Sequence, residues 1–317
     1  MKTDKGYPQW DTEKAEARRT SCMRGAKLLR QDVYKHNCEI FAAGGYISEN
    51  GKAVEIPTED PMLEKTKVYS EEFKLTHKGQ WTGTETGVEN TDCLKMALEM
   101  IQAGYNPAVL NLADAYTACG FYSRGSSAQE ESLCRASTLS RSLFQFYKAH
   151  SGKADRYAAA ASVALKESAY PLDINFGGIY TPNAIVFRNS QDELYTLKDT
   201  PFKVGFISVA ALDFNEKHGK NTEYQLPSGD ISPEGMEIMR NKIRTIYRIA
   251  ASNGHDSMIL GAFGCGAFRL PAETVASLFK EILNEEEFKG QFKAVKFAIL
   301  HKDDSYSKFA PFYEIFG

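Results

Sequence analysis

The sequence predicts an α/β fold in which helices cover a buried sheet. Short apolar runs are continuous rather than alternating, which is typical of strands buried on both faces. These runs lie at residues 108–112, 184–187, 204–212, 258–260 and 295–300. Between residues 204 and 300, amphipathic helical patterns separate them, so strand and helix alternate as in a layered sandwich.

The first eighty residues differ from the rest and predict an N-terminal extension. Residues 11–42 are charged and compatible with helices, whereas residues 44–61 alternate turn signals with short apolar stretches, as a hairpin does. We expect residues 1–83 to form this helical and hairpin extension and residues 84–317 to form the core domain.

Two helices of the core have clear boundary signals. Ser232 and Pro233 supply an N-cap and a proline at the first helical position. About twenty residues later, Asn253-Gly254 is expected to end this helix in the left-handed backbone conformation. The second helix is expected to start at Pro271. A further helix is expected to begin at about Ser127 to Gln129.

Composition restricts the classes of function. The 317 residues are 43% hydrophobic and 25% charged, as in globular proteins. A net charge of −3 argues against broad nucleic-acid binding. No apolar run approaches the roughly 18 residues of a membrane span, and the charged first residues show no signal peptide. We therefore expect a cytoplasmic monomer without a membrane partner.

The six cysteines and six histidines show no metal-ligand spacing, since CxxC and HExxH patterns are missing from the sequence. A chain of this length buries a core without disulfides, so reduced thiols are expected. We expect neither a metal nor an organic cofactor. His255 and His301 are expected to be structural.

The most informative segment is residues 111–139, which leaves a predicted strand, passes through a turn-rich loop and enters a helix. Loops at the carboxyl ends of strands in open α/β sheets bind ligands. Glu130 and Glu131 fall in the first helical turn, where they also complement the helix dipole, so a purely structural role stays open. Because neighbouring helical positions point about 100° apart, a catalytic pair would divide its roles between the two acids.

A second loop, residues 260–271, follows a predicted strand and leads into a helix. Its glycines allow backbone amides to face an anion, although a plain tight turn is the alternative. The loop is neither a Walker A motif nor GxGxxG. Cys265 between two glycines is a weaker candidate for a nucleophile, because no histidine is indicated beside it.

These segments resemble the poly(ADP-ribose) glycohydrolases. A turn-rich loop followed by QEE at residues 129–131 is similar to the family signature, which is a glycine triplet, a short spacer and QEE. AQEESLCRAS at 128–137 is most similar to the bacterial-type branch. Other segments that resemble the family, in order, are 19–34, 44–56, 88–104, 174–188, 204–215 and 260–271.

The resemblance implies a three-layer α/β/α macrodomain sandwich with a mixed central sheet that binds ADP-ribose. It implies that Glu131 is the general acid, that Glu130 holds ribose hydroxyls and that Gln129 shapes the loop. Phe268 would pack on the ribose. The residues whose backbone would turn toward the diphosphate are Gly264, Cys265, Gly266 and Ala267.

The chain departs from the family at the triplet, where it has Ala118-Cys119-Gly120, with Tyr116-Thr117 in place of the usual Asn-Pro. Glycines there permit positive φ and a close approach to the diphosphate, so Cys119 and Gly120 are expected to line the ligand in an altered loop. Asp114 stands where the family usually has Asn or Ser. Its carboxylate is expected to accept hydrogen bonds from ribose hydroxyls, although its charge would repel phosphate.

The expected ligand is ADP-ribose, free or as part of a modified protein or polymer. The first hypothesis is hydrolysis of ribose–ribose bonds in poly(ADP-ribose). The alternatives are an enzyme that removes single ADP-ribose groups from an acceptor, a non-catalytic ADP-ribose-binding protein, and reuse of the fold for another nucleotide-like ligand. The retained QEE favours catalysis, whereas the altered triplet favours the first two alternatives.

Overall fold

The chain folds as two compact units in a computed structural model that describes residues 6–148, 154–301 and 306–317. Unit 1 comprises Met1–Lys67, Tyr116–Pro171 and Thr181–Val204, and unit 2 comprises Val68–Ala115, Leu172–Tyr180 and Gly205–Gly317. The division at residue 84 expected from the sequence stays a prediction.

Unit 1 is mainly helical. Its helices are α1 (Thr12–Thr20), α2 (Gly25–Ala43), α3 (Pro61–Lys65), the short 3-10 helix η1 (Tyr122–Arg124), α5 (Gln129–Ala136), α6 (Leu139–Phe144) and α7 (Ala154–Ala160). Strands β1 (Gly45–Ile47) and β2 (Ala53–Glu55) pair antiparallel, with Tyr46 opposite Val54. This pair is the hairpin that the turn signals predicted. Gly44 ends α2 in the left-handed conformation (φ 76°), as a glycine C-cap does.

Two apolar clusters hold unit 1 together. One joins α2 and the hairpin to apolar residues of strands β6 (Gly178–Arg188) and β7 (Leu197–Val209). Its buried members are Ile40, Phe41, Tyr46, Val54, Ile56, Ile185, Phe187 and Leu197. The other packs α1 on α2 through Ala15, Leu29 and Val33, together with Tyr195.

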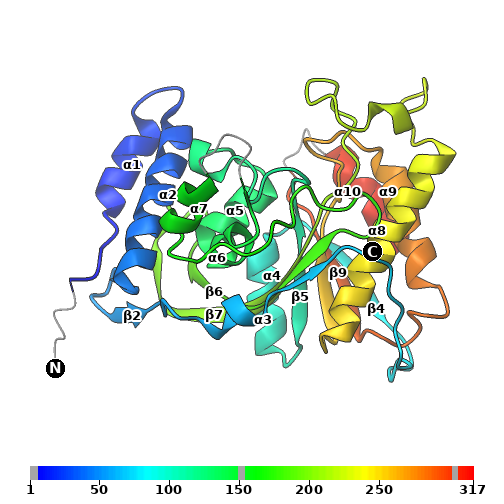
Figure 1. The fold of residues 1–317 in the computed structure, drawn as a ribbon, viewed down its shortest axis with the longest axis horizontal. Coiled ribbons are helices and arrows are strands. Elements are labelled where there is room, and N and C mark those ends of the chain that lie inside the picture. The colour runs from blue at the N-terminus through cyan, green and yellow to red at the C-terminus, as the bar shows by residue number, and fades with distance from the viewer. Residues whose placement is uncertain (1–5, 149–153, 302–305) are drawn as a thin grey trace. The chain divides into compact units, whose positions relative to one another are not determined.

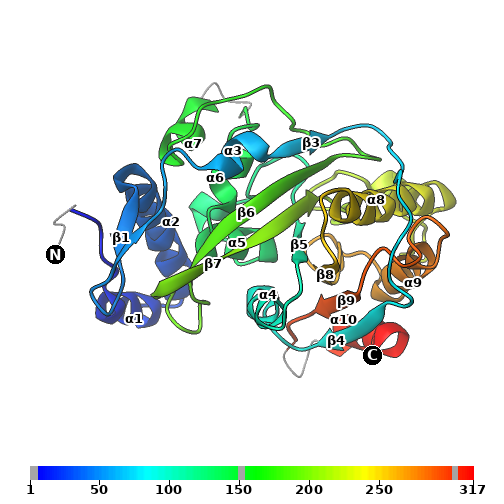
Figure 2. The same ribbon diagram turned by 90° about the horizontal axis from the view of Figure 1, so that it is seen from below.

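Unit 2 contains most of the sheet. Its elements are β4 (Glu85–Glu89), α4 (Cys93–Gln102), β5 (Pro107–Leu112), the 3-10 helix η2 (Thr222–Tyr224), α8 (Pro233–Ser252), β8 (Ser257–Leu260), α9 (Ala272–Leu283), β9 (Ala294–Ala298) and α10 (Tyr306–Phe316). With the short β3 (Lys67–Tyr69), hydrogen-bonded strands follow in the order β3-β6-β7-β5-β8-β9-β4. Strands β6 and β7 run through both units and are the two long green arrows of Figure 2.

Helices flank the sheet, so the predicted α/β class is confirmed. In unit 2 the pairs β7–β5, β5–β8, β8–β9 and β9–β4 are all parallel. Helices α8 and α9, yellow and orange in Figure 1, pack beside each other, and α10 packs on α9. Their apolar faces and the strands form one large core that includes Ile246, Tyr247, Phe279 and Phe297.

The structure differs from the sequence expectations in the length of two strands. β6 is 11 residues long and β7 is 13, although only 184–187 and 204–212 were expected. The N-terminal half of β7 is largely half-buried or exposed, so it lacks a continuous apolar run. In β6, Pro182 and Asn183 interrupt the pattern, and Asn183 has φ of 51°. No helix in the described ranges has the length and apolar character needed to cross a bilayer.

Candidate functional site

The sequence-predicted site residues fall in both units. Unit 1 holds the altered triplet and the QEE motif. Unit 2 holds Asp114, which follows strand β5, and the glycine loop. Those in unit 1 are Cys119, Gly120, Gln129, Glu130 and Glu131. Those in unit 2 are Asp114, Gly264, Cys265, Gly266, Ala267 and Phe268.

The altered triplet keeps a glycine-like backbone at two of its three positions. Cys119 has φ of 60° and Gly120 has φ of 52°, whereas Ala118 lies outside the positive-φ region. The Gly120 amide donates to the Thr117 carbonyl (2.9 Å), and the Tyr122 amide donates to Cys119 (3.1 Å). The Ala118 and Cys119 side chains are buried. The chain therefore accommodates both added Cβ atoms, at a backbone cost of about 1–2 kcal/mol for Cys119.

Gly120 lies directly against the two acids of the QEE motif. A Cβ placed on Gly120 would be 2.6 Å from Glu131 Oε1 and 3.4 Å from Glu130 Oε2. Although the two glutamates are neighbours on α5, one oxygen of each carboxylate therefore approaches the same point of the loop. Both side chains are almost fully buried, with 3% and 5% of Glu130 and Glu131 exposed.

The carboxylate of Glu131 is held on one side and free on the other. Its Oε1 accepts a hydrogen bond from the Phe121 amide (3.0 Å). Its Oε2 is buried and has no hydrogen-bond partner within the described residues. Buried polar atoms normally have a partner, and exceptions call for an explanation. The open Oε2 of Glu131 is such an exception among the described residues.

A buried polar network holds η1, which follows the altered triplet, and the end of α5 in place. Asn37 on α2 donates to the Tyr122 hydroxyl (2.8 Å) and to the Arg135 carbonyl at the end of α5 (2.9 Å). Its Oδ1 accepts from Arg188 Nε (2.7 Å). Arg188 Nη2 bonds the Nδ1 of His36 (2.5 Å). These residues were not predicted from the sequence, because only the fold brings α2 beside the QEE helix.

The thiol of Cys119 stays protonated at neutral pH. Complete burial, helped by the neighbouring Cys134 thiol and by the two glutamates, raises its pKa well above the ordinary value. Burial also raises the pKa of Cys134. The side chain that replaces a family glycine is therefore an apolar filler of the loop rather than a nucleophile.

In unit 2, residues 261–270 form the loop between β8 and α9 that was predicted from its glycines. Gly264 has φ of 75°, and a Cβ there would be 2.5 Å from Leu270 Cδ1 and 2.7 Å from the Ala211 Cβ. Space and backbone therefore both require glycine at 264. Gly266 is exposed, and a Cβ at that position would meet nothing within 4 Å.

The exposed part of this loop offers unpaired amides. The backbone N–H groups of Gly266, Ala267 and Phe268 have no intramolecular acceptor within the described chain. The carbonyls are occupied instead. Phe214 N–H donates to the Phe268 oxygen and Asn215 Nδ2 donates to the Ala267 oxygen, both at 2.9 Å. Three successive free amides suit an anion, which is the class of ligand expected for this loop.

Cys265 is not suited to the nucleophile role considered for it. Its side chain is buried and its Sγ donates to the Phe263 carbonyl (3.5 Å). Burial raises the pKa of the thiol to about 12, so the thiolate is scarce at neutral pH. His255 is likewise structural, because its two ring nitrogens bond Tyr180 Oη (2.8 Å) and the Asn106 carbonyl (3.0 Å).

The end of β5 and the loop after β7 contribute further polar groups in unit 2. Asp114 follows β5 and is half-buried. Asp213 Oδ2 bonds His218 Nδ1 (2.7 Å), and the His218 ring meets the Phe268 ring edge to face, with centroids 6.4 Å apart. Sequence reasoning missed this pair, because a lone Asp and a His five residues later carry no motif.

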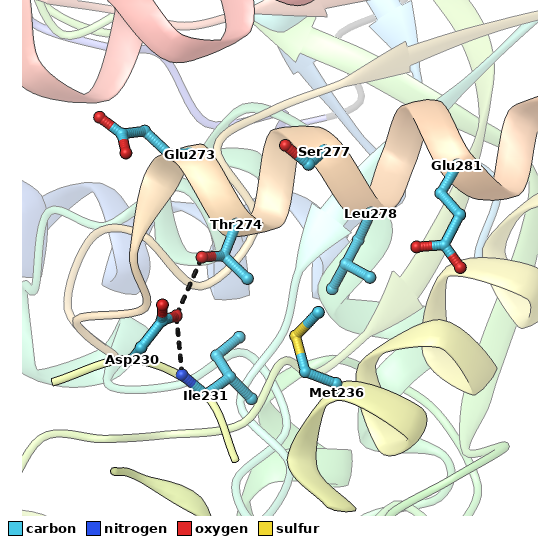
Figure 3. Close-up of a pocket in the computed structure, with 8 residues that line it drawn as sticks. All are labelled: Asp230, Ile231, Met236, Glu273, Thr274, Ser277, Leu278 and Glu281. Carbon is cyan, nitrogen blue, oxygen red and sulfur yellow. Dashed lines mark hydrogen bonds between the residues drawn. The ribbon is translucent and has the colours of Figure 1, made fainter. Parts of the chain in front are cut away.

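A separate hollow of unit 2 lies between α9 and the start of α8 and has an acidic rim of Asp230, Glu273 and Glu281 (Figure 3). There Asp230 Oδ1 accepts from Thr274 Oγ1 and from the Ile231 amide, both at 2.9 Å. The carboxylates on the rim of this hollow make it unsuited to an anionic ligand. It contains none of the site residues predicted from the sequence. The described residues hold no group of three or more His, Cys, Asp or Glu side chains arranged for a metal ion.

Comparison with known proteins identifies relatives of this chain. Residues 35–189 match the family described as microbial-type PARG, catalytic domain, where PARG stands for poly(ADP-ribose) glycohydrolase. No curated protein sequence matches.

Solved structures of bacterial poly(ADP-ribose) glycohydrolases share the fold. The enzyme from Thermomonospora curvata superposes with a TM-score of 0.69 at 23% identity, covering 90% of this chain and 99% of its own. Its complex with the inhibitor ADP-HPD gives 0.67 at 24%, with the same coverage. The Deinococcus radiodurans enzyme in complex with ADP-ribose gives 0.59 at 24%, covering 80% and 94%. The resemblance seen in the sequence is thus confirmed: this chain is similar to the microbial-type poly(ADP-ribose) glycohydrolases over residues 35–189 and shares the fold of their solved structures.

Proposed function

We propose that this protein is a glycohydrolase that cleaves the ribose–ribose bonds of poly(ADP-ribose), with Glu131 as its general acid. The observation that carries the proposal is the state of the Glu131 carboxylate. One oxygen is fixed by the Phe121 amide (3.0 Å), and the other is buried without a partner among the described residues. A positioned carboxyl group with one open oxygen meets the geometric requirement for proton transfer to a substrate.

In the proposed reaction, the bond between the anomeric carbon and the leaving ribose oxygen breaks, and the bonding electron pair stays with that oxygen. The leaving oxygen takes the proton of Glu131. Water then adds to the oxocarbenium-like carbon and gives a proton back to the Glu131 carboxylate, so the enzyme ends as it began. Glu130, whose carboxylate also approaches Gly120, holds ribose hydroxyls.

The ligand is assigned as ADP-ribose at the end of a polymer. The free amides of Gly266, Ala267 and Phe268 suit its diphosphate. The Phe268 ring is assigned to pack on a ribose. Gly120 supplies the positive φ that the family triplet provides. Asp114 and Gln129 are assigned to the ribose side of the ligand and to the shape of the loop. The relatives crystallised with ADP-ribose and with ADP-HPD support this assignment.

The test compares wild type with Glu131→Gln and Glu130→Gln in two assays, calorimetric binding of ADP-ribose and release of ADP-ribose from polymer. Glu131→Gln should lose about 10²–10⁴-fold in hydrolysis and keep its affinity for ADP-ribose. Glu234→Gln is the matched control, because Glu234 also lies in the first turn of a helix but is exposed. It should retain full activity.

The same two assays separate the alternatives. ADP-ribose binding by wild type without polymer hydrolysis, but with release from a mono-ADP-ribosylated protein, would replace the polymer assignment with the single-unit one. Binding without release from either substrate would indicate a non-catalytic ADP-ribose-binding protein. A loss of less than tenfold in a folded Glu131→Gln would remove Glu131 from the acid role.

A further inference from the structure

Arg269, which follows the glycine loop of unit 2, has an unusual backbone. Its φ is 62°, in the left-handed region that glycine adopts freely. A residue with a side chain adopts this conformation only at a cost in backbone free energy. Two hydrogen bonds hold it there, from the Arg269 amide to Gly266 (3.2 Å) and from the Leu270 amide to Gly264 (3.0 Å). Such strain is concentrated at functional sites.

The guanidinium of Arg269 brings no compensating contact within the protein. The side chain is exposed and makes no hydrogen bond, ion pair or aromatic contact with any described residue. Other arginines of unit 2 behave differently, since Arg240, Arg244 and Arg248 each bond a glutamate carboxylate at 2.8 Å. Stability within the fold therefore does not explain an arginine at this strained position.

The position of Arg269 suggests what its side chain contacts. It directly follows the free amides of Gly266, Ala267 and Phe268. The planar fork of N–H donors of a guanidinium and its positive charge match a phosphate group. The chain as a whole carries a net charge of −3 and offers an anionic ligand no general attraction.

We infer that Arg269 is a further ligand-binding residue, whose guanidinium binds a phosphate of the substrate diphosphate beside the amides of the glycine loop. This inference rests on the proposed function. The phosphate belongs either to the ADP-ribose unit in the loop or to the next unit of the polymer, and the chemistry of recognition is the same in both cases.

The test uses three substitutions at this position. Arg269→Ala removes the guanidinium and keeps the strained Cβ, Arg269→Lys keeps the charge without the fork, and Arg269→Gly removes both side chain and strain. Affinity for ADP-ribose and for a short ADP-ribose oligomer is measured by calorimetry at two salt concentrations. Arg24→Ala is the control, because the Arg24 side chain is also exposed and makes no hydrogen bond or ion pair with the described residues, but lies in unit 1.

Arg269→Ala should weaken binding about tenfold or more, the usual effect of a charge-assisted hydrogen bond, and should reduce its dependence on salt. Arg269→Lys should lose less. Arg269→Gly should bind as weakly as Arg269→Ala yet melt at a higher temperature than either wild type or Arg269→Ala, because the backbone strain is gone. Arg24→Ala should bind as wild type does.

The results also identify the phosphate. A loss with both ligands assigns it to the bound ADP-ribose unit, and a loss with the oligomer alone assigns it to the neighbouring unit. Unchanged affinity of Arg269→Ala for both ligands, with wild type binding normally, overturns the inference and leaves the proposed function standing. Failure of wild type to bind either ligand overturns both.

Discussion

The Cα of Gly120 faces the Glu131 carboxylate so closely that no side chain fits between them. A Cβ at residue 120 would lie 2.6 Å from Glu131 Oε1 and 3.2 Å from its Cδ. The backbone of Gly120 also has φ of 52°. Glycine is therefore required here both for space and for conformation.

Gly120→Ala should therefore damage both the fold and the reaction. The positive φ alone lowers the free energy of unfolding by about 1–2 kcal/mol. The added Cβ must also displace the Glu131 carboxylate, and a catalytic group moved by about 1 Å can cost about 100-fold in rate. Chemical denaturation measures the first effect, and polymer hydrolysis measures the second.

Gly51→Ala is the matched control for that prediction. Gly51 lies in the turn between β1 and β2, has φ of 74°, and a Cβ there would meet nothing within 4 Å. The variant should lose a similar amount of stability and keep full activity. Equal loss of activity in the two variants would show that the contact with Glu131 is irrelevant.

Much of the fold follows from local signals that the sequence displays. In α8 the Ser232 hydroxyl accepts from the Gly235 amide (3.2 Å), Pro233 opens the helix, and Gly254 follows it with φ of 78°. Each of these features depends on residues within a few positions, so residue type alone predicts it. In contrast, α10 was not predicted, because Pro311 lies inside it and argues against a helix.

The site was predicted less completely, for a physical reason. The QEE glutamates and the glycine loop are recognisable by residue type. The groups that hold them are not. Glu131 is fixed by the backbone amide of Phe121, a donor that nearly every residue type has. Asn37 reaches Tyr122 and Arg188 across 85 and 151 positions of the chain. Contacts of such separation depend on the completed fold and leave no local pattern.

A second prediction concerns the ion pair of Arg248 and Glu287 in unit 2. Arg248 is almost fully buried, and its Nε and Nη2 bond the two oxygens of Glu287 at 2.8 Å each. The Leu75 amide also donates to Glu287 (3.0 Å). Glu287→Gln leaves the buried guanidinium with only the Glu72 carboxylate, which lies 3.4 Å from its Nη1, so the free energy of unfolding should fall by up to about 3 kcal/mol.

The exposed pair of Glu286 and Lys289 is the control for this prediction, because Glu286→Gln removes a solvated carboxylate and should leave denaturation unchanged. Burial raises the pKa of Glu287, but the hydrogen bonds from Arg248 and the Leu75 amide, together with the charges of Arg248 and Lys74, outweigh burial, and the pKa is lowered overall. The folded carboxyl thus binds its proton less readily than the unfolded one. Its contribution is present at neutral pH and should be lost as the pH falls below about 4.5.

A third prediction concerns His36 and mild acid. Burial, followed by the charge of Arg188, lowers the pKa of His36 to about 3 from 6.5. The unfolded chain therefore binds a proton between these values and the folded chain does not. Stability should fall as the pH drops from 6.5 toward 3, by about 1.4 kcal/mol per pH unit from this one group.

Denaturation of wild type and His36→Phe at about pH 6.5, 6.0, 5.5 and 5.0 tests this, since these values span the upper part of that range. The variant should be less stable at every pH, because it loses the bonds to Gln9 and Arg188. The slope of its unfolding free energy against pH should be smaller, by the amount that corresponds to about one bound proton. Burial also lowers the pKa of His255. The stability of both proteins should therefore still depend on pH through His255. Identical slopes would mean that His36 titrates normally in the folded protein.

The last prediction separates ligand binding from chemistry. Asn215 holds the glycine loop of unit 2 through its bond to the Ala267 carbonyl (2.9 Å), whereas the QEE motif belongs to unit 1. Asn215→Ala should loosen the amides of residues 266–268 without changing Glu131. We expect about a tenfold weaker affinity for ADP-ribose and a higher KM, with kcat nearly unchanged, because the interaction stabilises substrate and transition state alike.

Asn241→Ala is the control. Asn241 donates a hydrogen bond to Asn175 (3.3 Å) in the same unit and makes no hydrogen bond to the described residues of the glycine loop. It should bind and hydrolyse as wild type does. A fall in kcat with unchanged KM in Asn215→Ala would contradict the prediction, because the loop would then act on the transition state alone. Normal affinity would show that the loop holds its shape without Asn215, through the Phe214 amide and the left-handed turn at Arg269.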